Sequence, residues 1–146
     1  MIIIAHAVIR VSDIDKLNIM EQQLNYDEWF FQSDYDLETA YQMLQSGRNI
    51  YCIFMCHLSL EKVLKGLFMK RLNDIPPKLH YLIYFVDKIS LTLKDSHLDF
   101  LMSLNRMSVI TRYPEDLRSM IKLFSQEQTN EIYEQTKSIQ QWIKQQ

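Results

Sequence analysis

Hydrophobic residues recur along most of the chain with the spacing of amphipathic helices. Between 27 and 46, a stripe of apolar or small side chains ends at Gly47, a residue type common just past a helix C-terminus. A second stripe, from 49 to about 72, is unusually broad, and we expect this helix to be covered on more than one side. The pattern predicts two long consecutive helices joined by a tight turn.

Prolines 76 and 77 must break the second helix, because proline lacks an amide donor and disfavours helical geometry in the residue before it. A shorter helix is expected at about 80–89. Ser96 can cap a fourth helix, which should stop at Tyr113 because Pro114 follows it. These signals predict two helices of unequal length after the proline break.

The end of the chain carries the signature of one more helix. Ser125 and Gln128 match a capping box, whereas 114–124 has no clean period and predicts a loop with one helical turn. Helices of this number, joined by short connections, pack most simply side by side. The predicted fold is all-α, an up-and-down antiparallel four/five-helix bundle.

The length of 146 residues suits one domain, and two glycines and three prolines leave little material for hairpins or linkers. We assign 25–146 to the helical domain and 1–24 to an N-terminal extension of uncertain status. Met1–Val11 is apolar but too short to span a bilayer, and no signal-peptide pattern follows. We therefore expect no membrane association, and the true start is Met1 or Met20.

Charge and cysteine content limit the kinds of site. A formal net charge of −2 argues against binding nucleic acid through bulk electrostatics, so any anion site must be local. Cys52 and Cys56 provide neither a disulfide framework nor enough ligands for zinc. We expect no metal and no cofactor, and a cytoplasmic protein.

Arg112 is the leading candidate for an anion site. It falls in the last predicted helical turn, and its planar guanidinium matches two phosphate oxygens at once. Asn105 and Ser108 precede it by seven and four positions, which places all three on one helical face. The alternative is an arginine that pairs with Glu115 or Asp116 and merely closes the helix.

Four further side chains have a functional and a structural interpretation. Lys62 and Lys65, next to Glu61, suit phosphate binding, although such a run is more typical of a solvated face. His57 lies on the apolar stripe, where a histidine is usually a hydrogen-bonded core residue; His80, at a predicted helix start, has a capping role as its structural alternative. The tyrosines and Trp142 are interpreted as core, although exposed aromatic rings can stack on bases.

Three segments, in this order, resemble the HEPN domains, helical modules named for nucleotide binding in higher eukaryotes and prokaryotes. They are His57–Gly66 (HLSLEKVLKG), Pro76–Leu82 (PPKLHYL) and Ser108–Glu115 (SVITRYPE), which contains the Thr-Arg-Tyr-Pro motif of a prokaryotic type. The resemblance extends from about Trp29 to Ile143. It implies a helical bundle that commonly forms a homodimer, with its anion site near the interface between the two protomers. The breadth of the 49–72 helix also favours a homodimer.

Many HEPN proteins resemble ribonucleases built on an arginine followed, after four to six residues, by a histidine that moves the 2′-hydroxyl proton. Here the corresponding positions are Leu117, Arg118 and Ser119, so that histidine is missing. Tyr81 also stands where relatives commonly carry aspartate after the histidine.

The resemblance therefore implies a module that binds a nucleotide or RNA phosphate near Arg112, working with a small nucleotidyltransferase in a toxin–antitoxin-like pair. One alternative is a divergent ribonuclease toxin that uses His57 or His80, and another is a non-catalytic helical dimer. The candidate nucleotide-binding residues are Arg112, Ser108, Asn105, Lys62, Lys65, His57, His80 and Tyr113.

Overall fold

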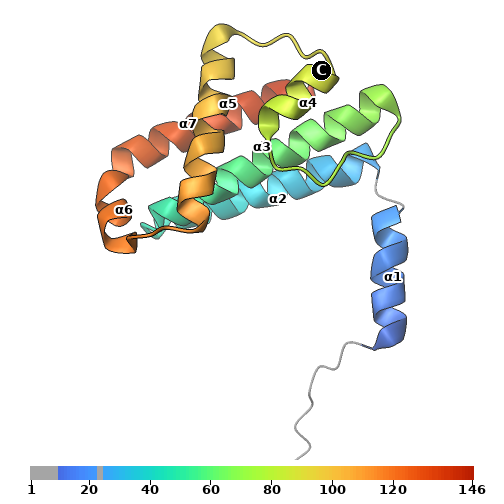
Figure 1. The fold of residues 1–146 in the computed structure, drawn as a ribbon, viewed down its shortest axis with the longest axis horizontal. Helices are drawn as coiled ribbons and strands as arrows, with labels where there is room; N and C mark the ends of the chain where they lie inside the picture. The colour runs from blue at the N-terminus through green and yellow to red at the C-terminus, as the bar shows by residue number, and fades with distance from the viewer. Residues whose placement is uncertain (1–9, 23–24) are drawn as a thin grey trace, which may run out of the picture.

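The computed structural model describes residues 10–22 and 25–146, and every described element is helical (Figure 1). The predicted all-α bundle is confirmed. Its helices are α1 (Val11–Gln22), α2 (Tyr26–Gln45), α3 (Asn49–Leu72), α4 (Leu82–Lys88), α5 (Asp95–Arg112), α6 (Leu117–Leu123) and α7 (Gln126–Lys144).

α2 and α3 form an antiparallel pair, and their bounds follow the sequence pattern closely. The side chain of Asn25 caps α2 by accepting a hydrogen bond from the Glu28 amide at 3.0 Å. Gly47 follows the C-cap with φ at +74°, a left-handed conformation that glycine adopts without a steric penalty. The chain can therefore reverse within three residues and start α3 at the predicted position.

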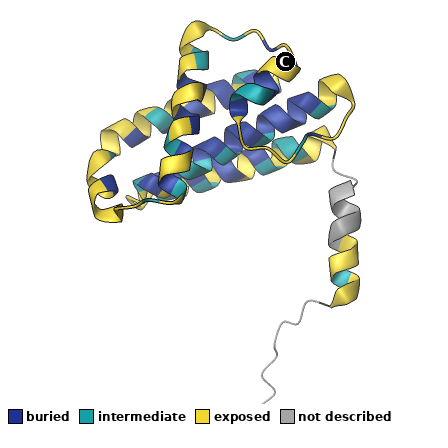
Figure 2. Ribbon diagram, in the orientation of Figure 1, coloured by how far each residue is buried: buried dark blue, intermediate teal, exposed yellow. Residues whose placement is uncertain are grey.

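α3 is the central helix of the bundle. Fourteen of its residues are buried, and α2, α4, α5 and α7 all pack against it (Figures 1 and 2). The broad apolar stripe predicted this multiple coverage correctly. The covering helices come from the same chain, however, so the breadth of α3 provides no argument for a dimer.

Polar contacts fix the register of α2 against α3 and α7. The hydroxyl of Ser33 donates to the Ser59 carbonyl at 2.7 Å, and that of Ser59 donates back to the Ser33 carbonyl at 2.9 Å. Gln140 donates to Asp34 Oδ1 at 2.6 Å. Small hydroxyl side chains allow this close approach, and the paired contacts leave neither of these two buried hydroxyls without a partner.

Two helix boundaries differ from the prediction. α5 begins at Asp95 after Lys94, which provides no side-chain cap, so Ser96 lies inside the first turn and is not the N-cap. α6 forms a seven-residue helix within the segment expected to be a loop with one helical turn, and the Asp116 side chain caps it through the Ser119 amide. The capping box of α7 is confirmed.

The tyrosines are not uniformly core residues as the sequence suggested. Tyr133 is buried, but Tyr35, Tyr51, Tyr81 and Tyr113 are all more than half exposed. The apolar start of the chain falls largely in 1–9, outside the described residues. Across the described part of the chain, no helix is both long and apolar enough to cross a membrane.

Candidate functional site

A cavity of about 480 Å³ lies along the outer face of α5, next to the loop that leads into α4. Most of its wall is apolar, and its polar groups include two arginines, a histidine, an asparagine and a serine. The lining residues are His80, Tyr81, Met102, Asn105, Arg106, Ser108, Val109, Arg112 and Tyr113. Five of the eight predicted candidates are therefore brought together.

Arg112 is the last residue of α5, and its half-buried side chain lies against Phe54 of α3. The guanidinium carbon is 5.2 Å from the centre of the Phe54 ring, a cation–π distance that orients the side chain without neutralising it. Among the described residues, neither Glu115 nor Asp116 forms an ion pair with Arg112. Asp116 instead binds the Ser119 hydroxyl at 2.6 Å.

Asn105 is a largely buried residue of the cavity lining, and its amide orientation is fixed. Its Oδ1 accepts the Leu82 amide hydrogen at 3.2 Å, so His57 Nε2, at 3.1 Å from the same oxygen, is the donor of that hydrogen bond. Asn105 Nδ2 is also buried and has no partner within the described structure. Ser108 donates its hydroxyl to the Asn105 carbonyl at 2.8 Å, which leaves a hydroxyl lone pair for another donor.

His57 is a core histidine, as its place on the apolar stripe suggested, and it does not line the cavity. Burial lowers the pKa of His57 below the ordinary value, although the Asn105 hydrogen bond and the Glu61 carboxylate partly oppose this effect. The other ring nitrogen, Nδ1, makes no hydrogen bond and lies 3.9 Å from Glu61 Oε2. A neutral ring with its hydrogen on Nε2 makes the Asn105 hydrogen bond and leaves the Nδ1 lone pair without a donor.

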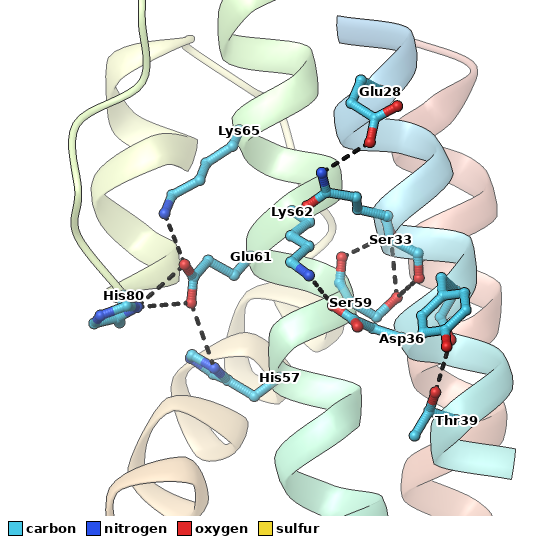
Figure 3. A network of polar contacts seen from close by, with 12 residues as sticks. Glu28, Ser33, Asp36, Thr39, His57, Ser59, Glu61, Lys62, Lys65 and His80 are labelled. Carbon is cyan, nitrogen blue, oxygen red and sulfur yellow. Dashed lines mark hydrogen bonds and ion pairs between the residues drawn. The ribbon is translucent and has the colours of Figure 1, made fainter. Parts of the chain in front are cut away.

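The centre of the polar network is the Glu61 carboxylate, whose side chain is only 5% exposed (Figure 3). Lys65, one turn later on α3, lies 2.7 Å from Oε1, and His80 Nδ1 lies 3.1 Å from each of the two oxygens. The prediction that this charged run forms a solvated face is therefore wrong for Glu61 and Lys65, which are both buried. Lys62 pairs with Asp36 at 2.7 Å, and neither lysine lines the cavity.

His80 connects this network to the cavity. Its side chain is 60% exposed, and its ring comes from the loop between α3 and α4 rather than from a helix face. Since Nδ1 faces the Glu61 carboxylate, the opposite nitrogen, Nε2, points away from that carboxylate. A titratable ring is thus held at the wall of the cavity that Arg112 also lines.

Four lining residues were not predicted from the sequence: Tyr81, Met102, Arg106 and Val109. Met102, Arg106 and Val109 lie on the same face of α5 as Asn105 and Arg112. Their helical spacing could have identified them from the sequence. In the same described residues, no group of three or more acidic, histidine or cysteine side chains is placed to hold a metal ion. Cys52 and Cys56 are buried free thiols.

The fold and the cavity define a small helical-bundle protein with a cationic pocket on one outer helix. Residues 26–146 match the HEPN domain family, and this chain belongs to that family. Among curated proteins, no significant match was found.

Two solved structures share the fold. TT1696 from Thermus thermophilus superposes with a TM-score of 0.71 at 14% identity, over 82% of this chain and 96% of that protein. ST0689, described as an archaeal HEPN homologue, gives a TM-score of 0.64 at 20% identity, over 83% of this chain and 96% of its own. At these identities, the likeness establishes the fold alone.

The buried ion pair predicts a large difference between two lysine substitutions. Lys65→Met should destabilise the protein by about 3–5 kcal/mol, because it leaves the Glu61 charge poorly compensated inside the protein. Lys144→Met breaks a half-exposed pair with Asp34 and should cost less than about 1 kcal/mol. Urea unfolding of both variants measures the difference, and equal losses of stability would contradict the buried network.

Proposed function

We propose that the cavity binds a nucleotide or an RNA phosphate through Arg112. The observation that carries the proposal is a guanidinium at the cavity wall with no carboxylate partner among the described residues. Its permanent charge and planar fork suit a phosphate group. Arg106 lines the same cavity and adds a second positive charge.

The apolar walls of the cavity suit a nucleobase. Tyr81 and Tyr113 are 56% and 81% exposed, and both line the cavity, so their rings are available for stacking. Met102 and Val109 supply apolar contact between them. A cavity of about 480 Å³ falls within the range of small-molecule sites and has room for a single nucleotide.

The polar candidates take different parts in this proposal. Ser108 and His80 line the cavity and can contact the ligand, whereas His57 acts through Asn105, whose amide it holds. Lys62 and Lys65 are left out, because each is paired with a carboxylate and neither lines the cavity. The site is local, as a chain with a net charge of −2 requires.

The partners proposed for the protein rest on its family membership. HEPN modules often act beside a small nucleotidyltransferase. We propose such an enzyme as the partner of this protein, in a cytoplasmic toxin–antitoxin-like pair. An adjacent nucleotidyltransferase reading frame and co-purification of the two proteins would support this pairing. A protein that binds no such enzyme when the two are expressed together would contradict it.

We also propose a homodimer, and its support is a set of exposed apolar side chains at the end of α5 and on α6. Val109, Ile110, Leu117 and Ile121 are each at least half exposed at the end of α5 and on α6. Apolar surface of this kind commonly marks a protein interface. Light scattering should give the mass of a dimer at micromolar concentration, reduced to a monomer by Ile121→Glu but not by Phe31→Glu on α2. A monomeric wild-type protein would contradict the proposal.

Arg112→Ala should weaken binding of ATP, GTP or a short single-stranded RNA by about ten- to a hundredfold, the loss expected for a charge-assisted contact worth about 1.5–3 kcal/mol. Arg112→Lys should retain part of the affinity, since it keeps the charge but loses the fork. Calorimetric titration of each ligand measures these changes.

Arg118→Ala is the matched control, because Arg118 is exposed on α6 and does not line the cavity. Its affinity should equal that of the wild type. Equal binding by wild type and Arg112→Ala would remove Arg112 from the site, and the absence of any binding by wild type would refute the proposed function as a whole.

A further inference from the structure

Asn105 carries a buried hydrogen-bond donor that no group of the described structure satisfies. The residue lines the Arg112 cavity and is only 8% exposed, and its Nδ2 has no acceptor. Buried side-chain donors are nearly always paired, because an unpaired donor has lost its bond to water without a replacement. A free amide donor in the wall of a cavity points to a ligand that supplies the acceptor.

The orientation of this amide cannot be reversed. Oδ1 accepts hydrogen bonds from the Leu82 amide at 3.2 Å and from His57 Nε2 at 3.1 Å, so both of its lone pairs are in use. Reversing the amide would place Nδ2 against the Leu82 N–H, donor against donor. Asn105 therefore offers a ligand only donors. It cannot form the two-bond contact with adenine that asparagine makes when its oxygen and nitrogen are both free.

Ser108, one helical turn after Asn105, offers the complementary group. It also lines the cavity and is 5% exposed. Its hydroxyl hydrogen is donated to the Asn105 carbonyl at 2.8 Å, so a lone pair is what remains for another group. A fixed donor and a fixed acceptor thus lie one turn apart on the same face of α5.

Asn105 lies at the end of the cavity where a base can stack. Its Oδ1 binds the amide of Leu82, and the preceding residue, Tyr81, lines the cavity with a ring that is 56% exposed. Arg112 follows Asn105 by seven residues on α5, which is about 10 Å along the helix axis. This spacing has the scale of a nucleotide with its phosphate at Arg112 and its base beside Tyr81 and Asn105.

We propose that Asn105 and Ser108 select bases that carry a ring carbonyl beside an N–H, namely guanine, hypoxanthine and uracil; this rests on the proposed binding of phosphate by Arg112. The carbonyl oxygen projects from the ring, so it can reach the recessed Nδ2 of Asn105. The adjacent ring N–H then donates to the free lone pair of Ser108.

Adenine and cytosine lack this arrangement. Each projects an amino group at the corresponding position, which would set a donor against the Asn105 Nδ2. Their adjacent ring nitrogen carries a lone pair, which would face the lone pair of Ser108. Both contacts are therefore lost together, and a site built around fixed polar groups rejects a ligand that leaves those groups unpaired.

The test compares inosine monophosphate with adenosine monophosphate on the full-length protein. The two nucleotides share sugar and phosphate and differ only at position 6 and in the hydrogen on N1. Calorimetric titration should show tighter binding of inosine monophosphate by about five- to a hundredfold, the range of a good two-bond contact to a base. Uridine monophosphate should exceed cytidine monophosphate for the same reason, and the tighter of the two oxo ligands identifies the ring that the cavity fits.

Asn105→Asp is the most informative variant, since it keeps Oδ1 for His57 and Leu82 and replaces the Nδ2 donor by an oxygen that accepts. The preference should reverse, with adenosine monophosphate bound more tightly than inosine monophosphate. The ratio of the two affinities removes the general loss that an added negative charge causes. Thermal unfolding shows whether the variant folds, and the wild-type comparison stands without it.

Asn130→Asp is the matched control, because Asn130 is exposed on α7 and does not line the cavity. It adds the same charge and should keep the wild-type preference.

Equal or weaker binding of inosine monophosphate by the wild type would overturn this inference and leave the proposed phosphate binding intact. An unchanged preference in a folded Asn105→Asp variant would overturn it as well, because the donor that reads the carbonyl is then gone. Wild-type protein that binds none of the four nucleotides and no RNA would refute both proposals.

Discussion

The buried charge of Glu61 is the constraint on which much of this structure depends. An ionised carboxylate inside a protein costs several kcal/mol unless charged and hydrogen-bonding partners surround it. Lys65 meets this need from the next turn of α3, and His80 meets it from the loop after α3. Because the loop returns to the middle of α3 for this contact, the pairing of His80 with Glu61 constrains the path of the proline-containing segment that leads into α4.

The same constraint explains why the cavity lies where it does. The returning loop places His80 and Tyr81 against the outer face of α5, where Arg112 and its neighbours line the cavity at helical spacing. Asn105 connects α5 to both α3 and α4, since it receives a hydrogen bond from His57 on α3 and another from the amide of Leu82 at the start of α4. The cationic site is thus a product of how three helices and one loop meet, in a protein whose overall charge is slightly negative.

The helices could largely be predicted from the sequence, because their signals are local. The bounds of α3 and the capping box of α7 follow from apolar spacing and from residues three positions apart. The prediction that Ser96 caps this helix was wrong, because Asp95 already lies within α5. A favourable residue type therefore did not determine where the helix begins. The length of α6 was underestimated, because a seven-residue helix has too few turns to show a clear apolar period.

The site was predictable only in part, since its polar contacts are not local. Arg112, Asn105 and Ser108 share one helix, and their common face follows from spacing alone. The charged run at Glu61 and Lys65 was expected in solvent, because a charged sequence motif does not reveal that a distant loop covers it. The contact between His80 and Glu61 depends on the fold of the whole α3–α4 connection, and no sequence period encodes it.

The measurement that tests this account most directly is the tautomer of His80, read from nitrogen-15 NMR spectra of the neutral imidazole ring. The account predicts that the hydrogen resides on Nδ1, with Nε2 unprotonated, and that Glu61→Gln abolishes this preference. A His80 ring with its hydrogen on Nε2, unaffected by the substitution, would contradict the central role of the buried carboxylate.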